Sequence, residues 1–88
     1  MADLDQHRRT VRVLELLSES FEAHKRGDKP ATDRIISEAA GLDLLALSGI
    51  QGGIIIGEIP NPERDWNSWV MYVEAARDAL AEAEGEQR

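Results

Sequence analysis

The side chains best suited to acid–base chemistry are the two histidines, His7 and His24. They are 17 residues apart, which in one helix separates them by about 25 Å. They therefore cannot share a site within one chain, and two histidines without any cysteine are too few for an ordinary zinc site. Neither histidine has a paired nucleophile, so no Ser–His–Asp arrangement can be assembled. The sequence predicts no catalytic residues, and we expect both histidines on the surface.

Rows of carboxylates at helical spacing are the second candidate for chemistry. Two rows occur: Glu15, Glu19 and Glu22, and Glu74, Asp78 and Glu82. Such rows could hold divalent ions or mimic the phosphates of a nucleic acid, but no Glu-x-x-His pair of the di-metal bundles accompanies them. Such rows are typical of the solvent-exposed face of an amphipathic helix. We therefore expect no metal site and no cofactor.

A glycine-rich segment invites comparison with a phosphate-binding loop. Gly49, Gly52, Gly53 and Gly57 punctuate an apolar run. The Lys-Ser/Thr ending of a phosphate loop and its strand–loop–helix context are missing. A packing role is the simpler interpretation: the glycines allow two backbones to approach closely, within one chain or between two chains.

The stretch from Thr32 to Ser48 resembles the core of a helix-turn-helix. In that motif a small residue packs at the helix crossing, a glycine takes the left-handed turn and an aliphatic residue follows. Ala40, Gly41 and Leu42 fill these places. The resemblance implies a regulator that binds DNA as a dimer, and we keep that function as the alternative.

The charge distribution opposes a DNA-reading role. No Lys or Arg occurs between Arg34 and Arg64, and residues 35–88 carry three basic and ten acidic side chains. DNA binding needs basic side chains on phosphates and polar side chains on base edges. Any contact would have to come from three arginines of the first helix: Arg8, Arg9 and Arg12. We therefore do not expect nucleic acid as a partner and prefer a plain helix–helix corner.

The two tryptophans, Trp66 and Trp69, are either interface anchors or core residues. Tryptophan is enriched in binding hot spots. Here it starts a 3-4-3-4-3 series of inward positions, the register of helix-on-helix packing: Trp66, Trp69, Val73, Ala76, Leu80 and Ala83. The register favours the core, although core and subunit interface can be one surface in so small a domain.

Composition limits the chain to one small globular domain. It has 88 residues, 42% apolar and 31% charged, and a net charge of -7. A chain of this size buries only about 60–65% of its unfolded surface, so its own core is thin. No apolar stretch follows the charged start, as a secretory signal would require, and charges and glycines interrupt the longest apolar segment. We expect a cytoplasmic protein without a membrane span.

Three helices are predicted, over about 4–26, 32–51 and 62–84, joined by an irregular connection over 52–61. Thr32 is expected to cap the second helix, with Ala39 among its inward residues, and Asn61 with Pro62 to begin the third. The apolar side chains of the first helix cover about 240° of its circumference, which requires more than one neighbour. Ile54–Ile56 also looks like a short strand, but a lone strand has no partner, so its state stays open.

The sequence therefore predicts an all-α fold, a small three-helix bundle that forms an oligomer because its apolar supply exceeds what the bundle can bury. We expect a self-associating protein–protein interaction module, whose partners are itself and another protein. The predicted contact residues are Leu44, Leu45, Leu47, Ile50, Ile54, Ile55, Ile56, Trp66 and Trp69.

Overall fold

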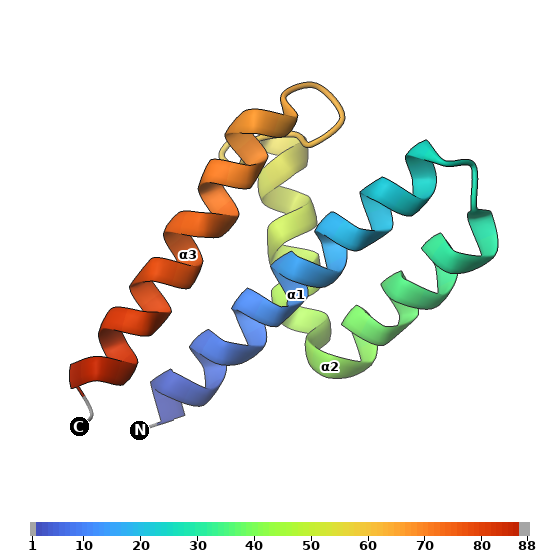
Figure 1. Cartoon of the computed structure of the whole chain (residues 1–88). Coiled ribbons are helices and arrows are strands. Elements are labelled where there is room, and N and C mark those ends of the chain that lie inside the picture. The colour runs from blue at the N-terminus through green and yellow to red at the C-terminus, as the bar shows by residue number, and fades with distance from the viewer. Residues whose placement is uncertain (1, 87–88) are drawn as a thin grey trace.

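A computed structural model describes residues 2–86, and within this range the chain is helical apart from its turns and contains no strand. The helices are α1 (Ala2–Lys25), α2 (Lys29–Ile56) and α3 (Trp66–Glu86). Helix α1 lies between the other two, and α2 is bent (Figure 1). The predicted all-α fold with three helices is confirmed.

The turn between α1 and α2 is tight. Gly27 adopts a positive φ of 75° after the last residues of α1, a conformation that glycine takes without steric cost. The Asp28 carboxylate accepts a hydrogen bond from the Ala31 amide at 3.1 Å, and Pro30 stands in the first turn of α2, where no amide hydrogen is needed. Helix α2 therefore starts at Lys29, and Asp28 is its cap in place of the predicted Thr32.

A bend at Asp43 divides α2 into a first arm (29–42) and a second arm (44–56). Asp43 has φ −160° and ψ 91°, which is extended backbone within the helix. Its Oδ1 accepts a hydrogen bond from the Ala46 amide at 3.0 Å, so the side chain caps the second arm as it would cap a separate helix. The expected left-handed turn at Gly41 is wrong, because among the described residues only Gly27 and Gly57 have positive φ.

The second arm continues farther than expected. It runs to Ile56, and Gly57 ends it in the left-handed conformation, φ 85°. The amides of Glu58 and Ile59 both donate to the Gly53 carbonyl, at 2.9 and 3.0 Å, which satisfies a carbonyl that the helix end leaves free. Residues 52–56 are therefore helical, and the irregular connection is confined to the segment that follows them.

Helix α3 begins at Trp66 and not at Pro62. The Asp65 carboxylate accepts hydrogen bonds from the Ser68 amide at 3.1 Å and from the Ser68 hydroxyl at 2.7 Å, so Asp65 is the cap. Asn61 instead caps a separate turn, in which its side chain accepts from the Glu63 amide at 2.9 Å. The prediction placed the start one turn too early because both residues are good caps.

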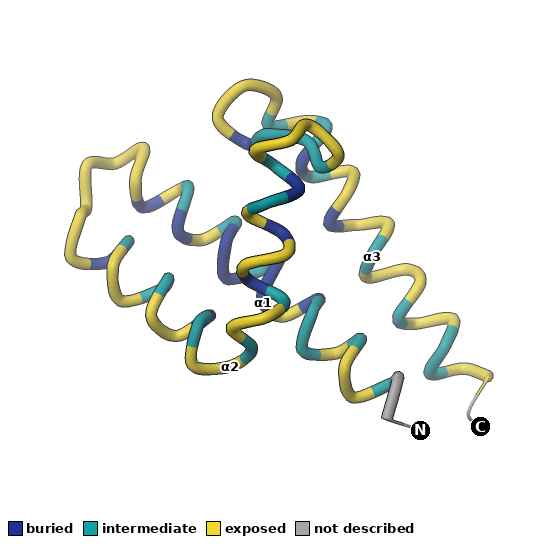
Figure 2. Tube along the Cα trace, turned by 180° about the vertical axis from the view of Figure 1, so that it is seen from behind, coloured by how far each residue is buried: buried dark blue, intermediate teal, exposed yellow. Residues whose placement is uncertain are grey.

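The core forms around α1, which packs against both other helices. Buried positions concentrate on α1 and on the parts of α2 and α3 that face it (Figure 2). This accounts for the wide apolar arc of α1: it has two neighbours. The predicted inward series of α3, from Trp66 to Ala83, is confirmed, because each of its members is buried or half-buried. The buried core members are Val13, Leu14, Leu16, Leu17, Ala39, Leu47, Ile50, Trp69 and Val73.

Candidate interaction surface

The predicted contact residues fall into three groups in the structure. Leu47, Ile50 and Trp69 are buried in the core of the chain itself, so their assignment to a contact surface is wrong: their side chains point toward α1. Ile54 and Trp66 are half-buried. The other four are largely exposed, with exposed fractions of 61% for Leu44, 86% for Leu45, 83% for Ile55 and 68% for Ile56.

Trp69 shows why the tryptophans are core residues. Its indole Nε1 donates a hydrogen bond to the Ser18 hydroxyl at 2.8 Å, which satisfies the one polar atom of the side chain. Phe21 meets its ring edge-on with centroids 6.2 Å apart, and Tyr72 stacks on it at the same distance. Trp66, at the start of α3, lies under the Lys25 ammonium at 5.3 Å.

The second arm of α2 has one inward and one outward side. At 100° per residue, the inward side consists of Ala46, Leu47, Ile50, Gly53 and Ile54, all buried or half-buried. The outward side is uncharged, and no charged residue occurs from Leu44 to Gly57. We name this outward side the aliphatic face; it consists of Leu44, Leu45, Ser48, Gly49, Gly52, Ile55 and Ile56.

The glycines of the second arm have different surroundings. A Cβ atom added at Gly53 would lie 2.8 Å from Cγ1 of Ile59, because the chain after the helix folds back onto this position. Nothing lies within 4 Å of a Cβ atom added at Gly49 or at Gly52. Packing inside the chain therefore explains Gly53 and leaves the two glycines of the aliphatic face unexplained.

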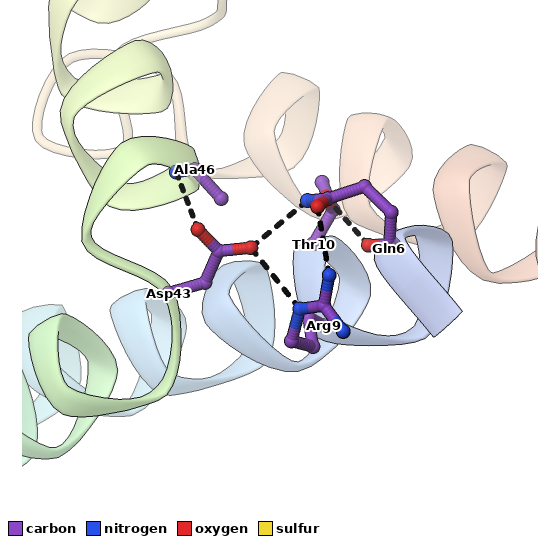
Figure 3. Close-up of polar contacts among 5 residues, drawn as sticks. All are labelled: Gln6, Arg9, Thr10, Asp43 and Ala46. Carbon is purple, nitrogen blue, oxygen red and sulfur yellow. Dashed lines mark hydrogen bonds and ion pairs between the residues drawn. The ribbon is translucent and has the colours of Figure 1, made fainter. Parts of the chain in front are cut away.

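Asp43 fixes the direction of the second arm by joining it to α1. Its Oδ2 accepts a hydrogen bond from Gln6 Nε2 at 2.9 Å and one from Arg9 Nε at 3.4 Å (Figure 3). The hydrogen bond from the Ala46 amide, followed by those from Gln6 and Arg9, lowers the pKa of the Asp43 carboxyl below its ordinary value of 3.8. The ionised carboxylate therefore stabilises the bend, and with it the orientation of the aliphatic face.

We expect Asp43 to make the fold acid-sensitive. Because its pKa is lower in the folded state, its contribution to stability is fully present above pH 3.8 and is lost as the pH falls through the lowered value. Asp43→Asn keeps a capping oxygen and removes the charge. At pH 7 the melting temperature of the wild type should be higher than that of this variant. The difference between the two melting temperatures should shrink as the pH is lowered to about 3. A difference that is equal at both pH values would contradict the role of the charge.

The arginines that the sequence offers for DNA contacts are paired with carboxylates. Arg8 lies 3.2 Å from Asp5 and 3.0 Å from Glu84, and Arg12 lies 3.6 Å from Glu15 and 3.5 Å from Glu19. Arg9 is paired with Asp43. Arg9–Asp43 joins α1 to α2 and Arg8–Glu84 joins α1 to α3, whereas the other pairs lie within α1. Together the pairs reduce the positive charge available on α1.

The carboxylate rows and the histidines do not converge on a site. Glu15 bonds to Arg77 of α3 at 2.9 Å, so it acts as a link between helices. No group of three or more His, Asp or Glu side chains suited to a metal ion occurs in the described residues. His24 is exposed and borders an open, mainly apolar hollow of about 240 Å³ near the end of α1, with Phe21, Ile36 and Ile54 among its lining residues.

Two further findings concern helix α2 as a whole and the comparison of the chain with known proteins. By length and composition alone, α2 is apolar enough to cross a membrane, a criterion that core helices of soluble proteins also meet. The chain matches none of the protein-family models, curated proteins or solved structures compared with it.

Proposed function

We propose that this chain is a small protein–protein interaction module that self-associates through the aliphatic face and performs no catalysis. Such a module serves as an adaptor, a structural subunit or an inhibitor of a larger assembly. The observation that carries the proposal is the exposure of Leu44, Leu45, Ile55 and Ile56 on one side of the second arm. Contiguous apolar surface of this kind marks association sites in soluble proteins.

The energy available from the face suits a reversible contact. At about 25 cal/mol per Å², four largely exposed aliphatic side chains offer on the order of 400 Å² and about 10 kcal/mol per copy on burial. Association itself costs about 4–15 kcal/mol. Two copies that bury their faces against each other gain about 20 kcal/mol. With an association cost near the middle of that range the surplus is about 10 kcal/mol, which corresponds to a dissociation constant of about 0.1 µM.

The chemistry of the face favours a protein over the other partner classes. A nucleic acid needs cations, and the face has none. A membrane span needs about 30 Å of apolar helix, whereas the uncharged segment from Leu44 to Gly57 extends only about 20 Å. An uncharged aliphatic surface with small residues at its centre matches the packing surface of another helix.

The test is sedimentation velocity at tens of micromolar with one charge placed on the face. Wild type should sediment as a dimer or higher oligomer, and Ile55→Lys as a monomer, because the new ammonium would be buried without a partner. Lysine suits the last turn of a helix, so the fold should persist. Met71→Lys is the matched control: Met71 is 69% exposed but lies on α3, so this variant should associate like wild type.

Two outcomes would contradict the proposal. One is a wild-type monomer at about 100 µM, well above the estimated dissociation constant. The other is equal association of Ile55→Lys and Met71→Lys, since the contact would then lie elsewhere. Circular dichroism of each variant shows that it has folded.

A further inference from the structure

The geometry points to a specific occupant of the aliphatic face: a second copy of this chain, whose second arm crosses the first antiparallel about a two-fold axis at residue 50. This inference rests on the proposed self-association and adds the partner's orientation and register to it. Three observations carry it: the order of side-chain sizes along the face, the two unexplained glycines, and the charges at the two ends of the face.

The order of side-chain sizes is symmetric about residue 50. Large aliphatic residues stand at 44 and 45 and again at 55 and 56, and small residues stand at 48 and 52. In an antiparallel pair centred on residue 50, Leu44 faces Ile56 of the second copy, Leu45 faces Ile55, and Ser48 faces Gly52. In these three pairs large residues meet large ones and small residues small ones, whereas Gly49 meets the exposed Gln51. A two-fold contact requires such self-complementarity.

The small residues lie where two crossing helices are closest. Helices that cross at an angle separate toward their ends, so large side chains fill the ends and small ones suit the crossing point. A Cβ atom added at Gly49 or Gly52 would meet open space, so nothing inside the chain requires glycine there. A backbone that approaches from outside does require it.

The two ends of the face carry matching charges. Asp43 and Arg9 lie together at the start of the second arm. Glu58 follows its end, and Arg64 borders the hollow lined by Ile55 and Ile56. The antiparallel arrangement brings the first end of one copy to the second end of the other, so Glu58 of each copy can face Arg9 of the other. The Asp43 carboxylate stays engaged within its own chain. A dimer of a chain with net charge -7 is disfavoured by repulsion, and this pairing reduces it locally.

Substituting a bulky residue at the crossing point distinguishes this close helix packing from a non-specific apolar contact. Gly52→Leu adds apolar surface, and the chain has room for it. If the backbones cross at this position, the dissociation constant should rise about tenfold or more, because the new side chain keeps them apart. Gly41→Leu, at a helical glycine of the first arm with equally open surroundings, is the control and should leave the constant unchanged. Tighter association of Gly52→Leu would overturn the inference.

Cross-linking tests the orientation independently of that variant. The chain has no cysteine, so Leu45→Cys and Ile55→Cys each introduce one thiol. The two positions are about 15 Å apart along the helix. With a short bismaleimide, a mixture of the two variants, one of them carrying a size tag, should give chiefly the mixed product, and each variant alone should give little.

The outcomes separate this inference from the proposed function. If each variant alone cross-links better than the mixture, the helices are parallel: the inference is wrong and self-association stands. If wild type is a monomer in sedimentation, both fail. If wild type is a dimer that Ile55→Lys leaves intact and no variant cross-links, the second arm is not the contact, and again both fail.

Discussion

Replacing Trp69 with alanine is expected to lower the melting temperature by about 12–40 °C. Truncating a fully buried Trp costs about 3–5 kcal/mol, whereas a chain of 88 residues has a total stability of roughly 4–13 kcal/mol. Trp69 is completely enclosed and is the largest of the side chains through which α3 packs on the core around α1. Thermal unfolding followed by circular dichroism measures the loss.

Trp66→Ala is the matched control for this prediction. Trp66 is the same residue type, three positions earlier on the same inward side, but it is only half-buried and its main polar contact is the Lys25 ammonium. We expect a loss of about 1–2 kcal/mol. Equal losses for the two variants would mean that α3 is not anchored through Trp69. Trp69→Phe should fall between them, because it keeps an aromatic ring but leaves the Ser18 hydroxyl without its donor.

The inward side of α3 could be predicted because one periodicity persists along the helix. From Trp66 to Ala83, alternating steps of three and four residues select the same side, and all charged residues of this stretch lie at the remaining positions. An inward position defined by so many repeats is insensitive to an error in the helix start. For this reason the late start at Trp66, one turn after Pro62, did not change which residues are buried.

The bend at Asp43 could not be predicted from the surrounding sequence. Leu42, Leu44 and Leu45 suit a continuous helix, and Gly41 is the more conspicuous helix breaker. The outcome depends on contacts from a distant segment, because Gln6 and Arg9 of α1 donate to the same carboxylate that caps the second arm. The available signal was one acidic residue inside an apolar run, which is a good helix cap.

The division of the apolar residues into core and surface depended on knowing where the second arm ends. Leu44, Leu47 and Ile55 are all large aliphatic residues, and they differ only in the side of the helix on which they lie. Once the helix is known to run from Leu44 to Ile56, the 100° rule places Leu47 and Ile50 on one side and Ile55 on the other. The sequence left residues after 51 undecided, so all these residues were assigned together to one contact.

The bend and the aliphatic face belong to one arrangement. The bend at Asp43 changes the direction of the helix between the first arm and the second arm. The Asp43 cap turns the arm back, so that Leu47, Ile50 and Gly53 pack on the core while the opposite side stays in solvent. The protein therefore uses one ionised carboxylate both to complete its core and to direct an uncharged helix surface outward.

Replacing Ala39 with leucine is expected to destabilise the fold by about 1–3 kcal/mol, the usual cost of overpacking a filled core. Ala39 lies on the first arm and is completely buried in the core around α1, so a larger side chain must push the arm away. The melting temperature should fall by about 5–15 °C. Ala75→Leu, at an exposed position of α3, is the control and should change stability by at most about 0.5 kcal/mol. If both variants have the melting temperature of the wild type, the first arm does not pack on α1 as the structure places it. The bend at Asp43 would then not join two arms that both pack on the core.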